Sequence, residues 1–218
     1  MEQVNDSCCT NPEVSNDPSQ KRAILLVLII NLLFFFGEGI AGILAQSSSL
    51  LADAVDMGGD AFVYFLSLLA LNRSLKSKSK VALFNSGFEL ILGLVVLIEV
   101  ISKIFRDVQP ISSTMLIVGS LALLANLTSG AILLAHRHKD INMKAVWMCT
   151  RNDILNNFFT LIAAGCVYLF NSKWPDIIGG FLIAGLIVFF SFRVLLESWK
   201  HFNGESANTS QRPKKSDD

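Results

Sequence analysis

Six long apolar segments, separated by short polar connections, occupy most of the chain. Each segment has 23–26 residues, whereas a helix needs about 20 apolar residues to cross a bilayer. Short connections make consecutive helices antiparallel neighbours. The pattern therefore predicts an all-α membrane protein with six transmembrane helices, at residues 23–46, 48–71, 81–104, 113–135, 145–170 and 174–196.

Basic residues predict the orientation of these helices. Arg106 and Lys173 are the basic residues of the connections on one side. The connections on the other side and the chain ends carry many more, and positive charge accumulates on the cytoplasmic side. We therefore expect both termini in the cytoplasm, with a flexible tail at 1–20, a six-helix transmembrane domain at 21–196 and a short polar tail at 197–218.

Composition narrows the function classes. The chain is 52% hydrophobic and its formal net charge is zero, so a basic surface for nucleic acid is not expected. Its four cysteines do not form a disulfide pattern. Cys8 and Cys9 are adjacent in the polar N-terminal tail, where they either capture a soft metal or have no site role. Cys166 is interpreted as a small packing residue of the core.

Two short motifs lie inside predicted membrane helices: Asp56-x-x-x-Asp60 in the second and Cys149-x-x-x-Asp153 in the fifth. Residues four apart share one face of a helix. If the two helices face each other, they supply four ligands, the number that tetrahedral Zn²⁺ takes. The two motifs predict an intramembrane site for a divalent cation.

The second helix also contains Asp53, on the same stripe as Asp56 and Asp60. Each aspartate at a helix centre costs about 2.5–3.5 kcal/mol in lipid. Three together would cost about 8–10 kcal/mol. They must therefore face protein, water or a cation. A polar patch that joins helices is the alternative, but the predicted membrane segments hold too few basic residues to pair with them.

Other polar residues in the helices lie outside the two motifs. Asp53 and Asn157, one turn from the motifs, are candidates to support the ligands. Glu38 lies among glycines that permit close helix packing, and it either lines an entry path, carries protons or forms a structural hydrogen bond. Arg151 either extends to the interface or pairs with an acid. We interpret four others as helix-packing or helix-end groups: Glu89, Glu99, Asn126 and Asp176.

Several stretches resemble the cation diffusion facilitator family of divalent metal transporters, over roughly residues 21–200. The resemblance is carried by Glu38-Gly39, Ser49-Leu50-Leu51-Ala52-Asp53-Ala54, Asp56-x-x-x-Asp60, residues 142–164 and Trp174-Pro175-Asp176. In this family the second helix carries His-or-Asp-x-x-x-Asp, the fifth carries His-x-x-x-Asp, and both motifs bind metal. The resemblance implies six helices, cytoplasmic termini, and metal export by alternating access with proton antiport.

This sequence departs from the family pattern at two places. Cys149 stands where the family has histidine, so the donor set becomes three carboxylates and a thiol. Only 22 residues follow Leu196, too few for the ferredoxin-like cytoplasmic domain that the family generally carries. We therefore expect a short member whose homodimer is held mainly by its membrane helices.

The expected function is efflux of Zn²⁺, and also of Cd²⁺, from the cytoplasm in exchange for protons. The protein is not expected to be an enzyme or to hold a resident cofactor, and its expected location is the bacterial cytoplasmic membrane. An exporter of Co²⁺, Ni²⁺, Fe²⁺ or Mn²⁺ is one alternative, although thiolate disfavours Mn²⁺. A membrane metal sensor that binds without transporting is another.

Overall fold

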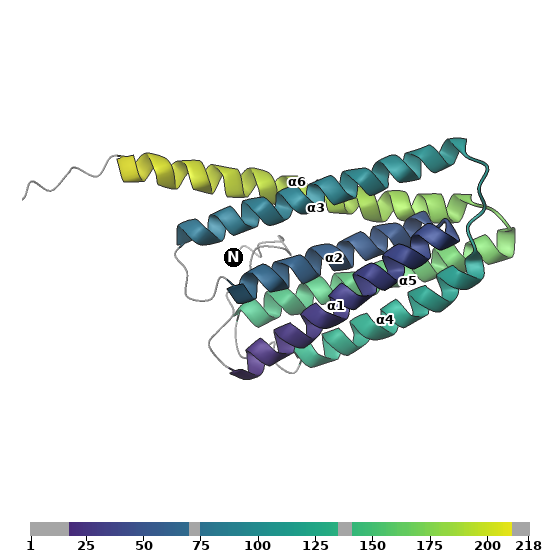
Figure 1. Cartoon of the computed structure of the whole chain (residues 1–218), viewed down its shortest axis with the longest axis horizontal. Coiled ribbons are helices and arrows are strands. Elements are labelled where there is room, and N and C mark those ends of the chain that lie inside the picture. Colours follow the sequence, from purple (N-terminus) through teal and green to yellow (C-terminus); the bar gives the residue numbers. More distant parts are fainter. Residues whose placement is uncertain (1–17, 70–74, 135–140, 211–218) are drawn as a thin grey trace, which may run out of the picture.

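A computed structural model describes residues 18–69, 75–134 and 141–210 (Figure 1). This part of the chain forms six helices joined by short connections. In order they are α1 (Pro18–Ala45), α2 (Ser48–Leu69), α3 (Leu75–Phe105), α4 (Ser112–Leu134), α5 (Ile141–Phe170) and α6 (Trp174–Ser210).

Three tight connections meet at one end of the bundle: α1 to α2, α3 to α4, and α5 to α6 (right in Figure 1). Gln46 ends α1 in a left-handed conformation with φ 53°. The N–H of Ser47 donates to Gly42 O at 2.9 Å, and the N–H of Gln46 donates to Ile43 O at 3.2 Å. These two bonds form a Schellman cap, which satisfies the last carbonyls of α1 and reverses the chain. Asn171, φ 46°, follows α5 at the same end.

Helix α2 is the centre of the bundle. It contributes to all three buried apolar clusters: Val63 and Tyr64 pack with α1 and α4, Ala52 and Val55 pack with α3 and α6, and Leu50 packs with α4 and α5. Among its described residues, Phe65 is the one large apolar side chain that is substantially exposed. Helix α2 is thus enclosed by protein, which explains how it tolerates three aspartates.

The other helices present wide apolar surfaces outwards. Large exposed apolar side chains occur on α1, α3, α4, α5 and α6, as expected for helices in contact with lipid. By length and composition, four stretches of the described chain are apolar enough to cross a membrane: Pro18–Ala45, Ser112–Leu134, Asp153–Phe170 and Trp174–Leu196. The described part of the chain is thus all-helical, with the character of a membrane-spanning protein. Charged residues interrupt the apolar stretches of α2 and α3.

Several helix ends differ from the sequence-based boundaries. We expected the third helix to begin at residue 81 and the sixth to end at 196, but α3 begins at Leu75 and α6 continues to Ser210. Helix α5 also begins earlier than expected, at Ile141. Backbone hydrogen bonding can continue a helix beyond its apolar segment, so an apolar pattern marks the apolar part of a helix and underestimates its length. Residues 1–17, with Cys8 and Cys9, lie outside the described part.

Candidate metal site between α2 and α5

Helices α2 and α5, which carry the two motifs, lie against each other and run antiparallel. Asn157 Nδ2 on α5 donates to Asp53 Oδ1 on α2 at 3.2 Å. One α2 turn further, Asn156 Nδ2 donates to Asp56 Oδ2 at 2.8 Å. The structure therefore brings the predicted stripe of α2 onto α5.

Asp60 and Asp153 occupy the same interface. Tyr64 donates its hydroxyl to Asp60 Oδ2 at 2.9 Å, one turn along α2. Asp153 is 5% exposed, and its Oδ2 has no hydrogen-bond partner among the described residues. The carboxyl group of Asp153 lies within electrostatic range of Asp60, Asp56 and Asp53. Four buried or half-buried carboxyl groups therefore share one contact between two helices.

A glycine pair next to Asp60 lets neighbouring helices approach α2. A Cβ added at Gly58 would lie 2.6 Å from the ring of Phe35 on α1. A Cβ added at Gly59 would lie 2.8 Å from Glu89 Oε1 on α3. Only the absence of a side chain allows these contacts, so the two glycines fix α1 and α3 close to the candidate ligands.

Glu89 thereby adds another carboxyl group to this region. It accepts hydrogen bonds from Ser191 Oγ at 3.0 Å and Asn85 Nδ2 at 3.2 Å, as expected of a group that joins helices α3 and α6. It also lies within electrostatic range of Asp56 and Asp60. Sequence reasoning interpreted Glu89 as a packing group and did not place it near the motifs.

Glu38 is fully buried on α1 and lies within electrostatic range of Asp53. Neither of its carboxylate oxygens has a hydrogen-bond partner among the described residues. The expectation of a structural hydrogen bond thus finds no support in this part of the chain, whereas a role in a path or in proton transfer remains a prediction. Buried polar atoms without a described partner also occur on Asn31, Asn126, Ser129 and Thr160.

Some predicted residues lie outside what the structure describes. The backbone of Cys149 belongs to α5, one turn before Asp153, but its side chain is outside the described part. Arg151 is exposed on α5, and Cys166 is a half-buried free thiol. Among the described side chains, no three from His, Cys, Asp and Glu are arranged to hold one metal ion.

Tyr64 and Asn156 were missed by sequence reasoning, although both were within its reach. Tyr64 is four residues after Asp60, and Asn156 is three residues after Asp153, and these spacings place side chains side by side on a helix. Glu89 gave no such signal, because it comes from a different helix.

A bundle with carboxyl groups on its central helix and apolar side chains on its outer surface is the arrangement of a membrane protein that handles cations. Comparison with known proteins specifies the family. Residues 24–201 match the cation efflux transmembrane domain. The chain belongs to this family, the cation diffusion facilitators, and is an integral membrane protein.

Relatives from bacteria and animals agree with this assignment. The zinc transporter ZitB of Yersinia pestis is 29% identical over 200 residues, covering 85% of this chain and 63% of the relative. The cadmium, cobalt and zinc/H(+)-K(+) antiporter of Bacillus subtilis is 21% identical over 197 residues, covering 84% and 63%. The probable proton-coupled zinc antiporter SLC30A4 of Homo sapiens is 23% identical, covering 88% and 54%. The chain thus spans about 63% of the length of the bacterial relatives, and its similarity to them agrees with a bacterial cytoplasmic membrane location.

Proposed function

We propose that this protein exports divalent metal cations, Zn²⁺ first and Cd²⁺ as well, in exchange for protons. The observation that carries the proposal is the meeting of Asp53, Asp56 and Asp60 on α2 with Asp153 on α5 inside the bundle. Buried charges are costly unless they are paired or coordinate a cation. The names of the relatives specify zinc, cadmium and cobalt as their cargo.

The proposed ligands of the transported ion are Asp56, Asp60, Cys149 and Asp153. Asn157 and Asp53 hold each other through a hydrogen bond and would keep the ligand helices in register. A thiolate is a soft ligand that suits Zn²⁺ and Cd²⁺, whereas Mn²⁺ prefers oxygen. The donor set therefore favours the softer cations.

Proton exchange follows from the chemistry of these ligands. Metal binding requires thiolate and carboxylate forms, so binding releases protons and protonation releases the metal. Three carboxylates and a thiolate carry two more negative charges than a divalent cation neutralises. An excess of negative charge inside a membrane is costly. At least one carboxyl group is therefore expected to retain a proton or a hydrogen bond, and Tyr64 supplies such a bond to Asp60.

Alternating access through six spanning helices with cytoplasmic termini completes the proposal. Helices α2 and α3 are not among the four described stretches that are apolar enough to cross a membrane by composition alone, but α2 is shielded from lipid by its neighbours. A charged helix enclosed in this way can span the membrane because its polar groups do not meet hydrocarbon. Homodimerisation through the membrane helices remains a prediction.

Purified protein in proteoliposomes with an imposed pH gradient tests the function. We expect uptake of Zn²⁺ and Cd²⁺ that stops when the gradient is dissipated, with less Co²⁺ and little Mn²⁺. The control variant is Asp107→Ala, which removes an exposed acid outside the helices whose ion-pair partner is the neighbouring Lys173. Zinc binding without flux would identify a metal sensor, and flux of Mn²⁺ above Zn²⁺ would contradict the assigned cargo.

A further inference from the structure

Asp176, at the start of α6, holds the beginning of α2. Its two carboxylate oxygens accept four hydrogen bonds from three consecutive serines. The donors are the backbone N–H groups of Ser48 at 2.7 Å and Ser49 at 3.0 Å, and the hydroxyls of Ser47 and Ser49, both at 2.7 Å. Asp176 is 1% exposed. These four residues are called the α2–α6 junction below.

The α2–α6 junction satisfies the entire N-terminus of α2. A helix begins with four N–H groups that lack partners within the helix. Here Ser47 N–H donates to α1, Ser48 and Ser49 donate to Asp176, and Leu50 N–H donates to Ser47 Oγ at 3.2 Å. A carboxylate at this position also interacts favourably with the helix dipole. Hydrogen bonds to an ionised acceptor are the strong ones, so separating α6 from α2 would leave several buried donors without partners.

Close packing reinforces these bonds. A Cβ added at Gly180 on α6 would lie 2.6 Å from Ser48 Cβ, and one added at Gly179 would lie 3.5 Å from Ser49 Cβ. The backbones of α2 and α6 therefore touch at the junction, with no space for one to slide past the other.

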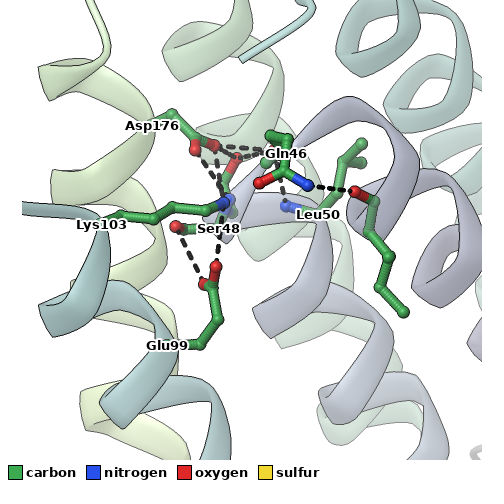
Figure 2. Close-up of polar contacts among 9 residues, drawn as sticks. Gln46, Ser48, Leu50, Glu99, Lys103 and Asp176 are labelled. Carbon is green, nitrogen blue, oxygen red and sulfur yellow. Dashed lines mark hydrogen bonds and ion pairs between the residues drawn. The ribbon is translucent and has the colours of Figure 1, made fainter. Parts of the chain in front are cut away.

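Helix α3 joins the same cluster. Lys103 Nζ pairs with Glu99 Oε1 at 3.4 Å, and Ser48 Oγ donates to Glu99 Oε2 at 3.4 Å. Figure 2 shows Lys103 and Glu99 reaching from α3 towards Ser48, beside Asp176. Three helices are thus connected at the end of the bundle where α2 begins.

We propose that Asp176 is a positioning residue for transport, which keeps α2 and α6 joined at this end through the whole cycle. Asp53 follows Ser49 by one helical turn, with Asp56 and Asp60 beyond it. Because the first turn of α2 is held in place, the positions of all three carboxylates along and around the helix axis are set. The movement that admits and releases the cation then occurs at contacts other than the α2–α6 junction. This inference rests on the proposed transport function.

A reversible crosslink tests whether the junction stays closed. Ser49→Cys and Gly179→Cys place two thiols whose Cβ atoms lie at a separation that suits a disulfide. Cys8→Ser, Cys9→Ser and Cys166→Ala are added in the same protein to prevent other pairings, while Cys149 is kept. We expect efficient crosslinking, and zinc flux in the oxidised protein within about twofold of the reduced protein, because a junction that never opens does not limit the cycle.

Flux that is lost on oxidation and recovered with reductant would overturn the proposal, since the junction would then have to open. Failure to crosslink would contradict the contact itself. Each single-cysteine variant, oxidised in the same way, controls for oxidation of Cys149. Absence of flux even in the unmodified protein would instead overturn the transport function, so the two failures are distinct.

The positioning role also predicts a change in zinc affinity. Asp176→Ala removes all four acceptor contacts, so the half-saturating zinc concentration should rise about tenfold or more, since a single hydrogen bond to a charged group is worth that much. Asp176→Asn keeps one oxygen acceptor and should lie between Asp176→Ala and the parent. A purely structural role would lower thermal stability in both variants and leave the affinity of the folded protein unchanged, which would contradict the proposal.

Discussion

Asp176 and Asp153 are both buried beside α2, yet their surroundings differ. Asp176 accepts four hydrogen bonds at the α2–α6 junction. Asp153 faces Asp60, Asp56 and Asp53 across the α2–α5 interface, and its Oδ2 has no hydrogen-bond partner among the described residues. Burial alone therefore does not distinguish a structural carboxylate from a ligand. Both oxygens of Asp176 have donors, whereas Asp153 Oδ2 has none among the described residues.

The same contrast separates the two sides of α2. At the junction, serine donors and a carboxylate acceptor match one another. At the α2–α5 interface, acceptors outnumber donors, with Asn156, Asn157 and Tyr64 supplying one bond each to the three aspartates. An excess of acceptors attracts a cation or protons. The α2–α5 interface can therefore rearrange when it binds a cation or protons. Rearrangement of the α2–α6 junction would only break hydrogen bonds that are already matched.

The largest expected effect comes from Asp60→Asn and Asp153→Asn. Each keeps the size of the side chain but removes the charge that the cation needs, so zinc flux should fall at least about 100-fold, more than loss of a supporting residue costs. The thermal stability of both variants should hold or rise, because fewer acids then repel one another. Asp176→Asn should show the reverse pattern, with lower stability and partial flux. Parent-like zinc flux in Asp60→Asn or Asp153→Asn would remove that residue from the site.

A second prediction concerns the softness of the ligands. Cys149→Asp should lower Cd²⁺ flux by about 10–100-fold relative to the parent. The same substitution should lower Co²⁺ or Mn²⁺ flux less. Cys149→His should keep zinc flux, because imidazole also suits zinc, and Cys149→Ser should lose most of it. If all three variants match the parent for every metal in proteoliposomes, Cys149 is a packing residue and the fourth ligand lies elsewhere.

The sequence predicted the helical class and the pairing of the two motif helices for physical reasons. Three aspartates at helical spacing cannot face lipid, so α2 had to be enclosed. The hydrogen bonds around Asp176 were harder to predict from the sequence, because Asp176 and Ser48 are 128 residues apart and serines at a helix start are common. The hydrogen bonds of Glu89 agree with its interpretation as a packing group, but its closeness to Asp60 was not predicted, because it depends on how α3 crosses α2 at Gly59. The helix ends were wrong where polar residues extend α3 and α6.

A smaller effect is expected for Asn157→Ala. The substitution removes the donor to Asp53 but no proposed ligand, so apparent zinc affinity should fall about tenfold while maximal flux persists. Thr128→Ala is the control, since this exposed hydroxyl bonds to Leu124 O within its own helix. Equal zinc affinities in the two variants would show that the α2–α5 interface does not depend on the Asp53–Asn157 contact.

The smallest effect on flux is expected at the glycines of α6. Gly180→Ala places a Cβ 2.6 Å from Ser48 Cβ and 2.7 Å from the Ser48 carbonyl carbon, so the α2–α6 junction must shift, at a cost of about 1–3 kcal/mol of stability. Gly185→Ala lies on the same helix, and its Cβ would meet nothing within 4 Å. That substitution should gain up to about 1 kcal/mol, because alanine favours helix. Thermal unfolding in detergent compares the two proteins. Equal melting temperatures would mean that the α2–α6 junction accommodates an added methyl group without loss of stability. The junction would then not be a more rigid contact than the α2–α5 interface.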